Sequence, residues 1–284
     1  MENIPEITIE NVMKRYSVLL LDAYGVLVHI SGALDGAVEL IDELNRTQKP
    51  YLILTNDASK LPESCSKRFR GYGLEIDAER IISSGALLKD YFESHQLKGA
   101  RCAVLGPEDS LRYVEMAGGR IVSQEKDFDV VAICDETGFP FRETIDTLMS
   151  TLFHLLDRDK KVHLVLSNPD LIFPKSDQGF ALTAGSIALI LEAALKLRYP
   201  DRSELEFTRL GKPHPAMFEA AIERCGTRDM VMIGDQIETD IRGANGVGLD
   251  SVLVSTGVSN WVTTPIPNHL RPTYRLLDLK PRHS

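Results

Sequence analysis

The sequence predicts an α/β protein built on parallel β-sheets. Short apolar runs rich in Val, Leu and Ile, each too brief for a helix, alternate with segments whose apolar residues recur at helical spacing. Many of the short runs end abruptly in a polar residue or a glycine, as strands do at the edge of a sheet. This alternation is typical of βαβ units, in which successive strands lie parallel and the connecting helices cover them.

The first half of the chain follows this alternation from its start. A short helix is predicted over 6–15, and the run at 17–21, which ends in Asp22, has the composition of a strand buried on both faces. The further strands predicted in this half cover 51–54, 81–82, 102–105 and 130–133. The helices predicted between them cover 35–46, 62–72, 87–93 and 110–116.

The second half repeats the pattern without a change of composition that would mark a linker. Its predicted strands cover 162–166, 207–210, 230–233 and 251–254. Its predicted helices cover 144–156, 184–197, 215–225 and 239–245, and the proline near the start of the third is at a position that helices favour. The Pro-rich tail contributes one last apolar pair at 276–277.

Composition excludes several classes of function. The 284 residues are 43% hydrophobic, enough for one large domain or two ordinary ones, and the net charge of -9 argues against nucleic acid as a partner. No stretch approaches the roughly 18 apolar residues of a membrane span, and the acidic N-terminus does not resemble a signal peptide. The four cysteines form no CxxC pair, so we expect reduced thiols and a cytoplasmic protein.

Polar residues that could form one chemical site follow four of the predicted strands. They are Asp22, Thr55, Asn56, Lys212, Asp235 and Asp240. Each one alone is equally compatible with an ordinary strand end, turn or helix cap. Together they match a phosphate site, because Mg²⁺ prefers carboxylate oxygens, an amine offsets negative charge, and hydroxyl and amide groups hold phosphate oxygens.

Four motifs in order carry a resemblance to a known family. They are DAYGV at 22–26, LTN at 54–56, GKPHPAMF at 211–218 and GDQIETDI at 234–241, with SNPD at 167–170 and TAGSIALILEA at 183–193 as further matches. With them the sequence resembles a haloacid dehalogenase (HAD) superfamily hydrolase of subfamily IIA, in the branch of sugar phosphatases and 4-nitrophenylphosphatases. The resemblance implies a Rossmann-like, doubly wound parallel sheet as the core, at 1–83 and 184–284, with an inserted α/β cap at 84–183.

The resemblance also implies a covalent mechanism. Asp22 would be the nucleophile that becomes an aspartyl-phosphate. Mg²⁺ would be held by the carboxylates of Asp22 and Asp235 and by the backbone carbonyl of Tyr24. Asp240 would order metal-bound waters or orient Lys212, which would stabilise the nucleophile and the transferring charge.

The remaining expected site residues bind substrate. Thr55 and Asn56, with Lys212, would hold the phosphoryl group. The cap would close over the site and choose the leaving group, with Asp135, Asn168 and Asp170 as its expected substrate contacts.

Tyr24 is a departure from the phosphatase pattern, which has a second Asp at this position as general acid and base. Such a group is typically worth about 10²- to 10⁴-fold in rate, and a phenol is a poor replacement at neutral pH. We expect the ring to pack in the seam between cap and core. Another group then supplies the proton, or the substrate has a good leaving group, or turnover is slow.

The sequence therefore predicts an Mg²⁺-dependent phosphatase of a small phosphorylated metabolite, for which a sugar phosphate is one candidate. One alternative is a catalytically weakened protein that binds phosphate ligands. Another is an atypical hydrolase acting on a C–halogen or C–P bond, although the complete GDxxxTDI motif argues for a metal and phosphoryl chemistry. The resemblance makes a homodimer a candidate assembly, whereas the substrate itself is not encoded in any motif.

Overall fold

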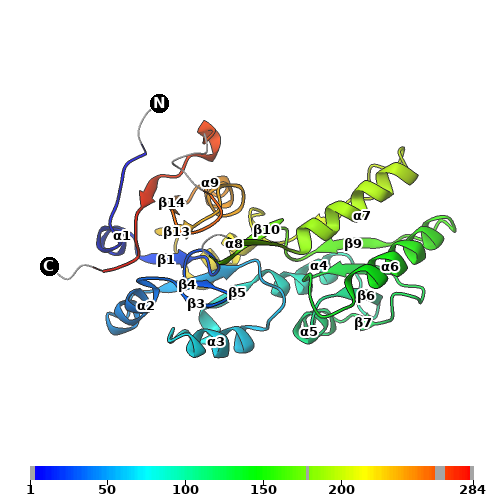
Figure 1. Ribbon diagram of the computed structural model, residues 1–284, viewed down its shortest axis with the longest axis horizontal. Coiled ribbons are helices and arrows are strands. Elements are labelled where there is room, and N and C mark those ends of the chain that lie inside the picture. The colour runs from blue at the N-terminus through cyan, green and yellow to red at the C-terminus, as the bar shows by residue number, and fades with distance from the viewer. Residues whose placement is uncertain (1–3, 177–178, 260–265, 282–284) are drawn as a thin grey trace.

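The computed structural model describes residues 4–176, 179–259 and 266–281. The molecule is elongated, with one parallel β-sheet and its helices at each end (Figure 1). We call the part that contains β1 the core and the other part the cap. The predicted class, α/β with parallel sheets, is confirmed.

The core sheet has six parallel strands in the order β15-β14-β13-β1-β4-β5. Their bounds are β1 (Val18–Leu21), β4 (Tyr51–Thr55), β5 (Ile81–Ser83), β13 (Met230–Gly234), β14 (Asp250–Val254) and β15 (Tyr274–Leu276). The core helices are α1 (Ile9–Arg15), α2 (Ala37–Arg46), α3 (Pro62–Gly71), α8 (Ala216–Cys225) and α9 (Arg242–Gly246). Short helical turns are η1 (Ala78–Arg80), η2 (Ser84–Leu87), η3 (Ile237–Ile241) and η4 (Asn268–Leu270).

Strand β1 is buried on both faces, as its composition predicts. Leu19 and Leu21 pack in the cluster that contains α1, α2 and α3, whereas Val18 and Leu20 pack on the opposite face with α8. Alternate side chains of a strand point to opposite faces, so a continuous apolar run is needed where helices cover both. The first polar residue, Asp22, is consequently placed at the carboxyl edge.

The cap sheet has five parallel strands in the order β12-β9-β8-β6-β7. Their bounds are β6 (Arg101–Leu105), β7 (Arg120–Ile121), β8 (Val130–Ile133), β9 (His163–Leu166) and β12 (Thr208–Arg209). Helices α4 (Leu88–Ser94) and α5 (Glu108–Met116) cover one face, and α6 (Phe141–Leu156) and α7 (Ala184–Arg198) cover the other.

The predicted return to the core at residue 184 is wrong. Helix α7 buries Ile187 and Leu191 against α6 and the cap strands, and β12 pairs with β9 in the cap sheet. The second crossing therefore follows β12, and the strand predicted at 207–210 belongs to the cap. An apolar helix face fits any apolar layer, so the sequence pattern alone does not say which sheet it covers.

Two antiparallel hairpins complete the described part and were not predicted. They are β2 (Val28–His29) with β3 (Gly32–Ala33), and β10 (Ile172–Ser176) with β11 (Gly179–Leu182). The second is partly exposed, since Phe180 and Leu182 are among the exposed apolar residues. Both pairs are short, and neither shows the strong apolar run by which the buried parallel strands are recognised.

Candidate active site

The carboxyl edge of the core sheet brings the predicted polar residues together. Asp22 follows β1 directly, Asp235 follows the neighbouring strand β13, and Thr55 ends β4 on the other side of β1. Open α/β sheets place their ligands at this edge, where the strand order changes direction.

Lys212 lies in the middle of this group and is 2% exposed. Its Nζ donates to Oδ1 of Asp22 at 2.6 Å and to Oδ1 of Asp240 at 2.7 Å. Burial disfavours a charged ammonium, but the neighbouring acids, Asp22 foremost, raise the pKa of Lys212 above its ordinary value. The lysine is therefore a fixed cation in contact with the predicted nucleophile.

Asp240 holds the lysine from the opposite side. It lies in η3, and its Oδ2 accepts from the backbone N–H groups of Asp235 and Gln236, each at 3.1 Å. A side chain at Gly234 would overlap Asp240, so this glycine allows the close approach. Of the two predicted roles of Asp240, the contacts match the orientation of Lys212.

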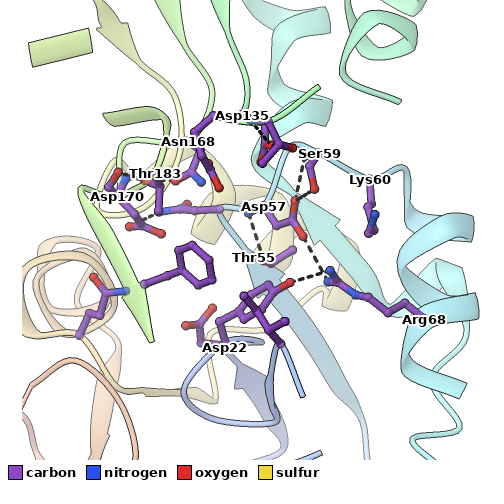
Figure 2. A pocket seen from close by; sticks show the side chains of 17 residues that line it. Asp22, Thr55, Asp57, Ser59, Lys60, Arg68, Asp135, Asn168, Asp170 and Thr183 are labelled. Atoms are coloured by element: carbon purple, nitrogen blue, oxygen red, sulfur yellow. Dashed lines mark hydrogen bonds and ion pairs between the residues drawn. The ribbon is translucent and has the colours of Figure 1, made fainter. Parts of the chain in front are cut away.

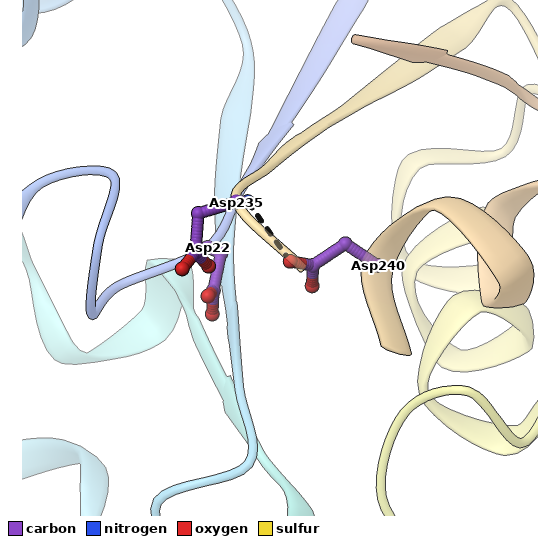
Figure 3. A group of neighbouring side chains, drawn as sticks. All are labelled: Asp22, Asp235 and Asp240. Carbon is purple, nitrogen blue, oxygen red and sulfur yellow. Dashed lines mark hydrogen bonds between the residues drawn. The ribbon is translucent and has the colours of Figure 1, made fainter. Parts of the chain in front are cut away.

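Asp235 has the features of a cation ligand. Its Oδ2 accepts from the backbone N–H of Val258 at 2.7 Å, but its buried Oδ1 has no hydrogen-bond partner among the described residues. Oxygens of Asp22, Asp235 and Asp240 lie within 4.8 Å of one another (Figure 3). A hard divalent cation such as Mg²⁺, which takes carboxylate and carbonyl oxygens, fits this donor set.

Glycines allow the backbone to approach Asp235 closely. A Cβ at Gly25 would lie 2.4 Å from Oδ2 of Asp235, and one at Gly257 would overlap the same carboxylate. Gly25 directly follows Tyr24, the predicted carbonyl ligand, so this close approach also places the Tyr24 backbone near Asp235.

Burial and mutual repulsion disfavour the charged forms of Asp22 and Asp235. Burial raises the pKa of Asp22 to about 6, although Lys212 opposes the rise. Burial and the charge of Asp22 raise the pKa of Asp235 well above its ordinary value. A bound divalent cation reverses this effect, because it favours the charged carboxylates.

The side-chain amide of Asn56, a residue predicted to bind phosphate, is hydrogen-bonded within the protein, and Asn56 also lines the cavity described below. Its Nδ2 donates to Asp170 Oδ1 at 2.9 Å and to the Lys212 carbonyl at 3.0 Å, and its Oδ1 accepts from the Lys212 N–H at 2.8 Å. The amide therefore positions the lysine. Thr55 accepts from the Asp57 N–H at 3.1 Å, which leaves its own hydroxyl proton for a ligand.

A cavity of about 220 Å³ lies between the core edge and the cap. Asp22 and Thr55 line it from the core, and the predicted cap residues Asp135, Asn168 and Asp170 line it from the cap (Figure 2). Burial raises the pKa of Asp170 to about 7.

Two of these cap residues have local roles within their loops. Asp135 accepts from the N–H and hydroxyl of Thr137, at 2.9 and 2.5 Å, and Asn168 accepts from the Asp170 N–H at 3.0 Å. These bonds hold each loop in shape at the edge of the cavity.

Tyr24 lies in the seam, as expected, with its ring 5.7 Å from that of Phe173 on β10. Its hydroxyl accepts from Nη1 of Arg68 at 2.6 Å, and Nη2 of the same guanidinium donates to Asp57 Oδ2 at 3.2 Å. Arg68 was not predicted as a site residue. A signal existed, since an arginine three residues after the buried Cys65 lies on the inward side of a helix.

Two family models and several known proteins are similar to this chain. Residues 19–120 match the family model described as haloacid dehalogenase-like hydrolase, and residues 209–280 match a second model described as HAD-hydrolase-like. A protein named acid sugar phosphatase from Staphylococcus haemolyticus is 28% identical over 269 residues, which cover 94% of this chain and 95% of that protein.

Solved structures have the same architecture over almost the whole chain. A possible sugar phosphatase of the HAD superfamily from Cytophaga hutchinsonii has a TM-score of 0.84 and 26% identity, covering 99% of this chain and 100% of that one. A glycerol phosphate phosphatase from Mycobacterium tuberculosis, in complex with magnesium, has a TM-score of 0.77 and 25% identity, covering 94% of this chain and 77% of that one.

Within the described residues, none of the helices has the length and apolar character of a membrane span.

Proposed function

Because the chain belongs to the haloacid dehalogenase-like hydrolases, we propose that it is an Mg²⁺-dependent phosphatase of small phosphorylated metabolites. One observation carries the proposal: the Lys212 ammonium touches Asp22 while the neighbouring Asp235 keeps a buried oxygen without a partner among the described residues. This is the arrangement that a nucleophilic carboxylate and a divalent cation require.

In the proposed reaction, Asp22 attacks phosphorus and the bond from phosphorus to the leaving oxygen breaks, giving an aspartyl-phosphate. Water then attacks this phosphorus and releases Asp22. Lys212 and the hydroxyl of Thr55 stabilise charge on the phosphoryl oxygens, while Asn56 and Asp240 hold the lysine in place.

We assign the cation site to Asp22, Asp235 and the backbone carbonyl of Tyr24. Bound Mg²⁺ supplies positive charge that offsets the phosphoryl group. A structural neighbour described in complex with magnesium supports the choice of a divalent cation. Asp135, Asn168 and Asp170 are proposed as contacts to the leaving group, since all three line the cavity from the cap.

The names of the relatives make sugar and glycerol phosphates candidate substrates. A homodimer and a cytoplasmic location stay predictions from the sequence.

The second candidate function is a phosphate-binding protein with weakened catalysis, which Tyr24 favours because it replaces the usual acid. The metal-free dehalogenase alternative is disfavoured by the buried oxygen of Asp235, which has no hydrogen-bond partner within 4–176, 179–259 and 266–281.

The deciding experiment measures phosphate release from 4-nitrophenyl phosphate and from a panel of metabolite phosphates, with Mg²⁺ or with a chelator. We expect Mg²⁺-dependent release that Asp22→Asn abolishes. The matched control is Asp201→Asn, at an exposed position, which should keep full activity. Absence of turnover with any compound, alongside ligand binding by calorimetry, would favour the binding protein instead.

A further inference from the structure

Among the acids that line the cavity, Glu136 is the one whose carboxyl is bonded to no other residue within the described part of the chain. It follows β8 in the cap, is partly buried, and its carboxyl interacts with its own backbone N–H. The other acids each accept a hydrogen bond from another residue: Asp22 from Lys212, Asp57 from Arg68, Asp135 from Thr137 and Asp170 from Asn56. The Glu136 carboxyl is therefore the acid most available to a molecule in the cavity.

Glu136 lies on the side of the cavity where the phosphatase pattern has its acid. The charges that act on its carboxyl are those of Asp135 and Asp57. Asp57 accepts from Arg68, which in turn donates to the hydroxyl of Tyr24, the residue at the position of the usual acid. Figure 2 shows Asp135, the neighbour of Glu136 in the chain, on the same side of the cavity as Asp57.

Asp170, a second cavity acid with a raised pKa, lies among the neighbours of the nucleophile instead. The charges that act on it are those of Lys212, Asp22 and Asp240. Its Oδ1 also accepts from Asn56 at 2.9 Å. We therefore assign Asp170 to substrate contact and not to proton transfer.

The leaving oxygen must point toward the cap. In-line displacement places it on the side of phosphorus away from Asp22, which lies at the core edge of the cavity. Glu136 lines the cavity from the cap, on the loop after β8. The bonds between Asp135 and Thr137 hold this loop in shape on either side of Glu136.

Burial keeps this carboxyl partly protonated at neutral pH. Burial foremost, and then the charges of Asp135 and Asp57, raise the pKa of Glu136 to about 7. The cations that line the same cavity, Lys60 and Arg68, do not reverse the rise. A general acid is most effective when its pKa lies near the working pH, and burial is a common way to bring a glutamate there.

We propose that Glu136 is a catalytic residue, the general acid by which the cap protonates the leaving oxygen in place of the core acid that Tyr24 replaces. The inference rests on the proposed phosphatase function and deepens it. It places alkyl phosphates, the class that includes sugar and glycerol phosphates, within the substrate range. An alkoxide is a strong base that requires a proton in order to depart, and Glu136 supplies it.

The proposed reaction returns every group to its starting state. Asp22 forms a bond to phosphorus, the P–O bond to the leaving group breaks, and the leaving oxygen takes the proton of Glu136. Water then attacks the aspartyl-phosphate, gives one proton to the Glu136 carboxylate and forms a new bond to phosphorus, while the bond between phosphorus and Asp22 breaks. The products are the alcohol and hydrogen phosphate.

The test compares kcat/KM of Glu136→Gln and wild type at saturating Mg²⁺, with 4-nitrophenyl phosphate and with alkyl phosphates that include glycerol phosphate. This ratio reports the first step, in which the leaving group departs. We expect a loss of about 10²- to 10⁴-fold with alkyl phosphates, the usual worth of a general acid. The loss with 4-nitrophenyl phosphate should be small, because nitrophenolate departs without a proton.

The pH profile gives an independent readout that a merely structural role would not change. With an alkyl phosphate, wild-type kcat/KM should fall as the pH rises past about 7, because Glu136 loses the proton that it must donate. This fall should be absent in Glu136→Gln. Glu143→Gln, the same substitution at an exposed position of the cap, is the matched control and should retain the wild-type rates and profile.

Several results would overturn the inference. They are an equal loss on both kinds of substrate in Glu136→Gln, no loss with alkyl phosphates, or a pH-dependent fall that Asp170→Asn removes and Glu136→Gln does not. Release from 4-nitrophenyl phosphate alone, abolished by Asp22→Asn, would overturn the inference and keep the phosphatase function. No release from any donor would overturn both.

Discussion

The contacts of Lys212 predict that replacing each of its two acids by asparagine has a different effect on stability. Asp240 is fully buried and accepts three hydrogen bonds, one from the ammonium and two from backbone N–H groups. In Asp240→Asn, the amide NH₂ replaces one of the two accepting oxygens, so a donor then faces either the Lys212 ammonium or the two backbone N–H groups, which are donors too. At least one bond to a charged group is lost.

The magnitude follows from that loss. A hydrogen bond to a charged group is worth about 1.5–3 kcal/mol, and a chain of this length loses about 2–4 °C of melting temperature per kcal/mol, so we expect a fall of about 3–12 °C. If the same free energy is lost from the transition state, phosphate release slows by about 10- to 100-fold. The lysine keeps its 2.6 Å bond to Asp22, which limits the damage.

Asp22→Asn should behave differently. The amide oxygen can still accept from Lys212, while the repulsion between residues 22 and 235 disappears. We expect no phosphate release, and a melting temperature without metal that is equal to or above that of the wild type. Calorimetry in chelator and a 4-nitrophenyl phosphate assay with Mg²⁺ measure both quantities. An unchanged melting temperature in Asp240→Asn, or a larger fall in Asp22→Asn, would refute the reasoning.

Three further predictions concern the cation site and the cavity. Mg²⁺ at 100 times its dissociation constant should add about 2.7 kcal/mol to the free energy of unfolding of the wild type and so raise its melting temperature. Asp235→Asn should remove this shift, and an equal shift in that variant would place the cation elsewhere. Gly257→Ala should abolish activity by overlapping Asp235, whereas Gly71→Ala, with open space around it, should be active and fold normally in the same assays. Burial raises the pKa of Glu136 to about 7 from 4.5, so the folded state binds its proton more tightly and the free energy of unfolding falls as pH rises through that range; urea titrations should find a shallower fall in Glu136→Gln.

Sequence alone determined the parallel α/β class and the edge where the chemistry lies. Apolar runs such as 18–21 are continuous only because helices cover both faces of the strand, and the polar residue that ends each run lies at the carboxyl edge. Parallel strands place their carboxyl ends together, so Asp22 and Asp235 could be grouped although they are far apart in the chain.

Tertiary structure alone decided what each polar group touches. The side-chain amide of Asn56, a residue predicted to bind phosphate, is hydrogen-bonded to Lys212 and Asp170. Arg68 was overlooked because its partners, Tyr24 and Asp57, come from other segments, and no local spacing connects them. The end of the cap was predicted at residue 183, whereas helix α7 and strand β12 also belong to the cap. An apolar helix face records that it is buried but not against which sheet, because burial of apolar surface is non-directional, whereas hydrogen bonds and ion pairs depend on where distant segments meet.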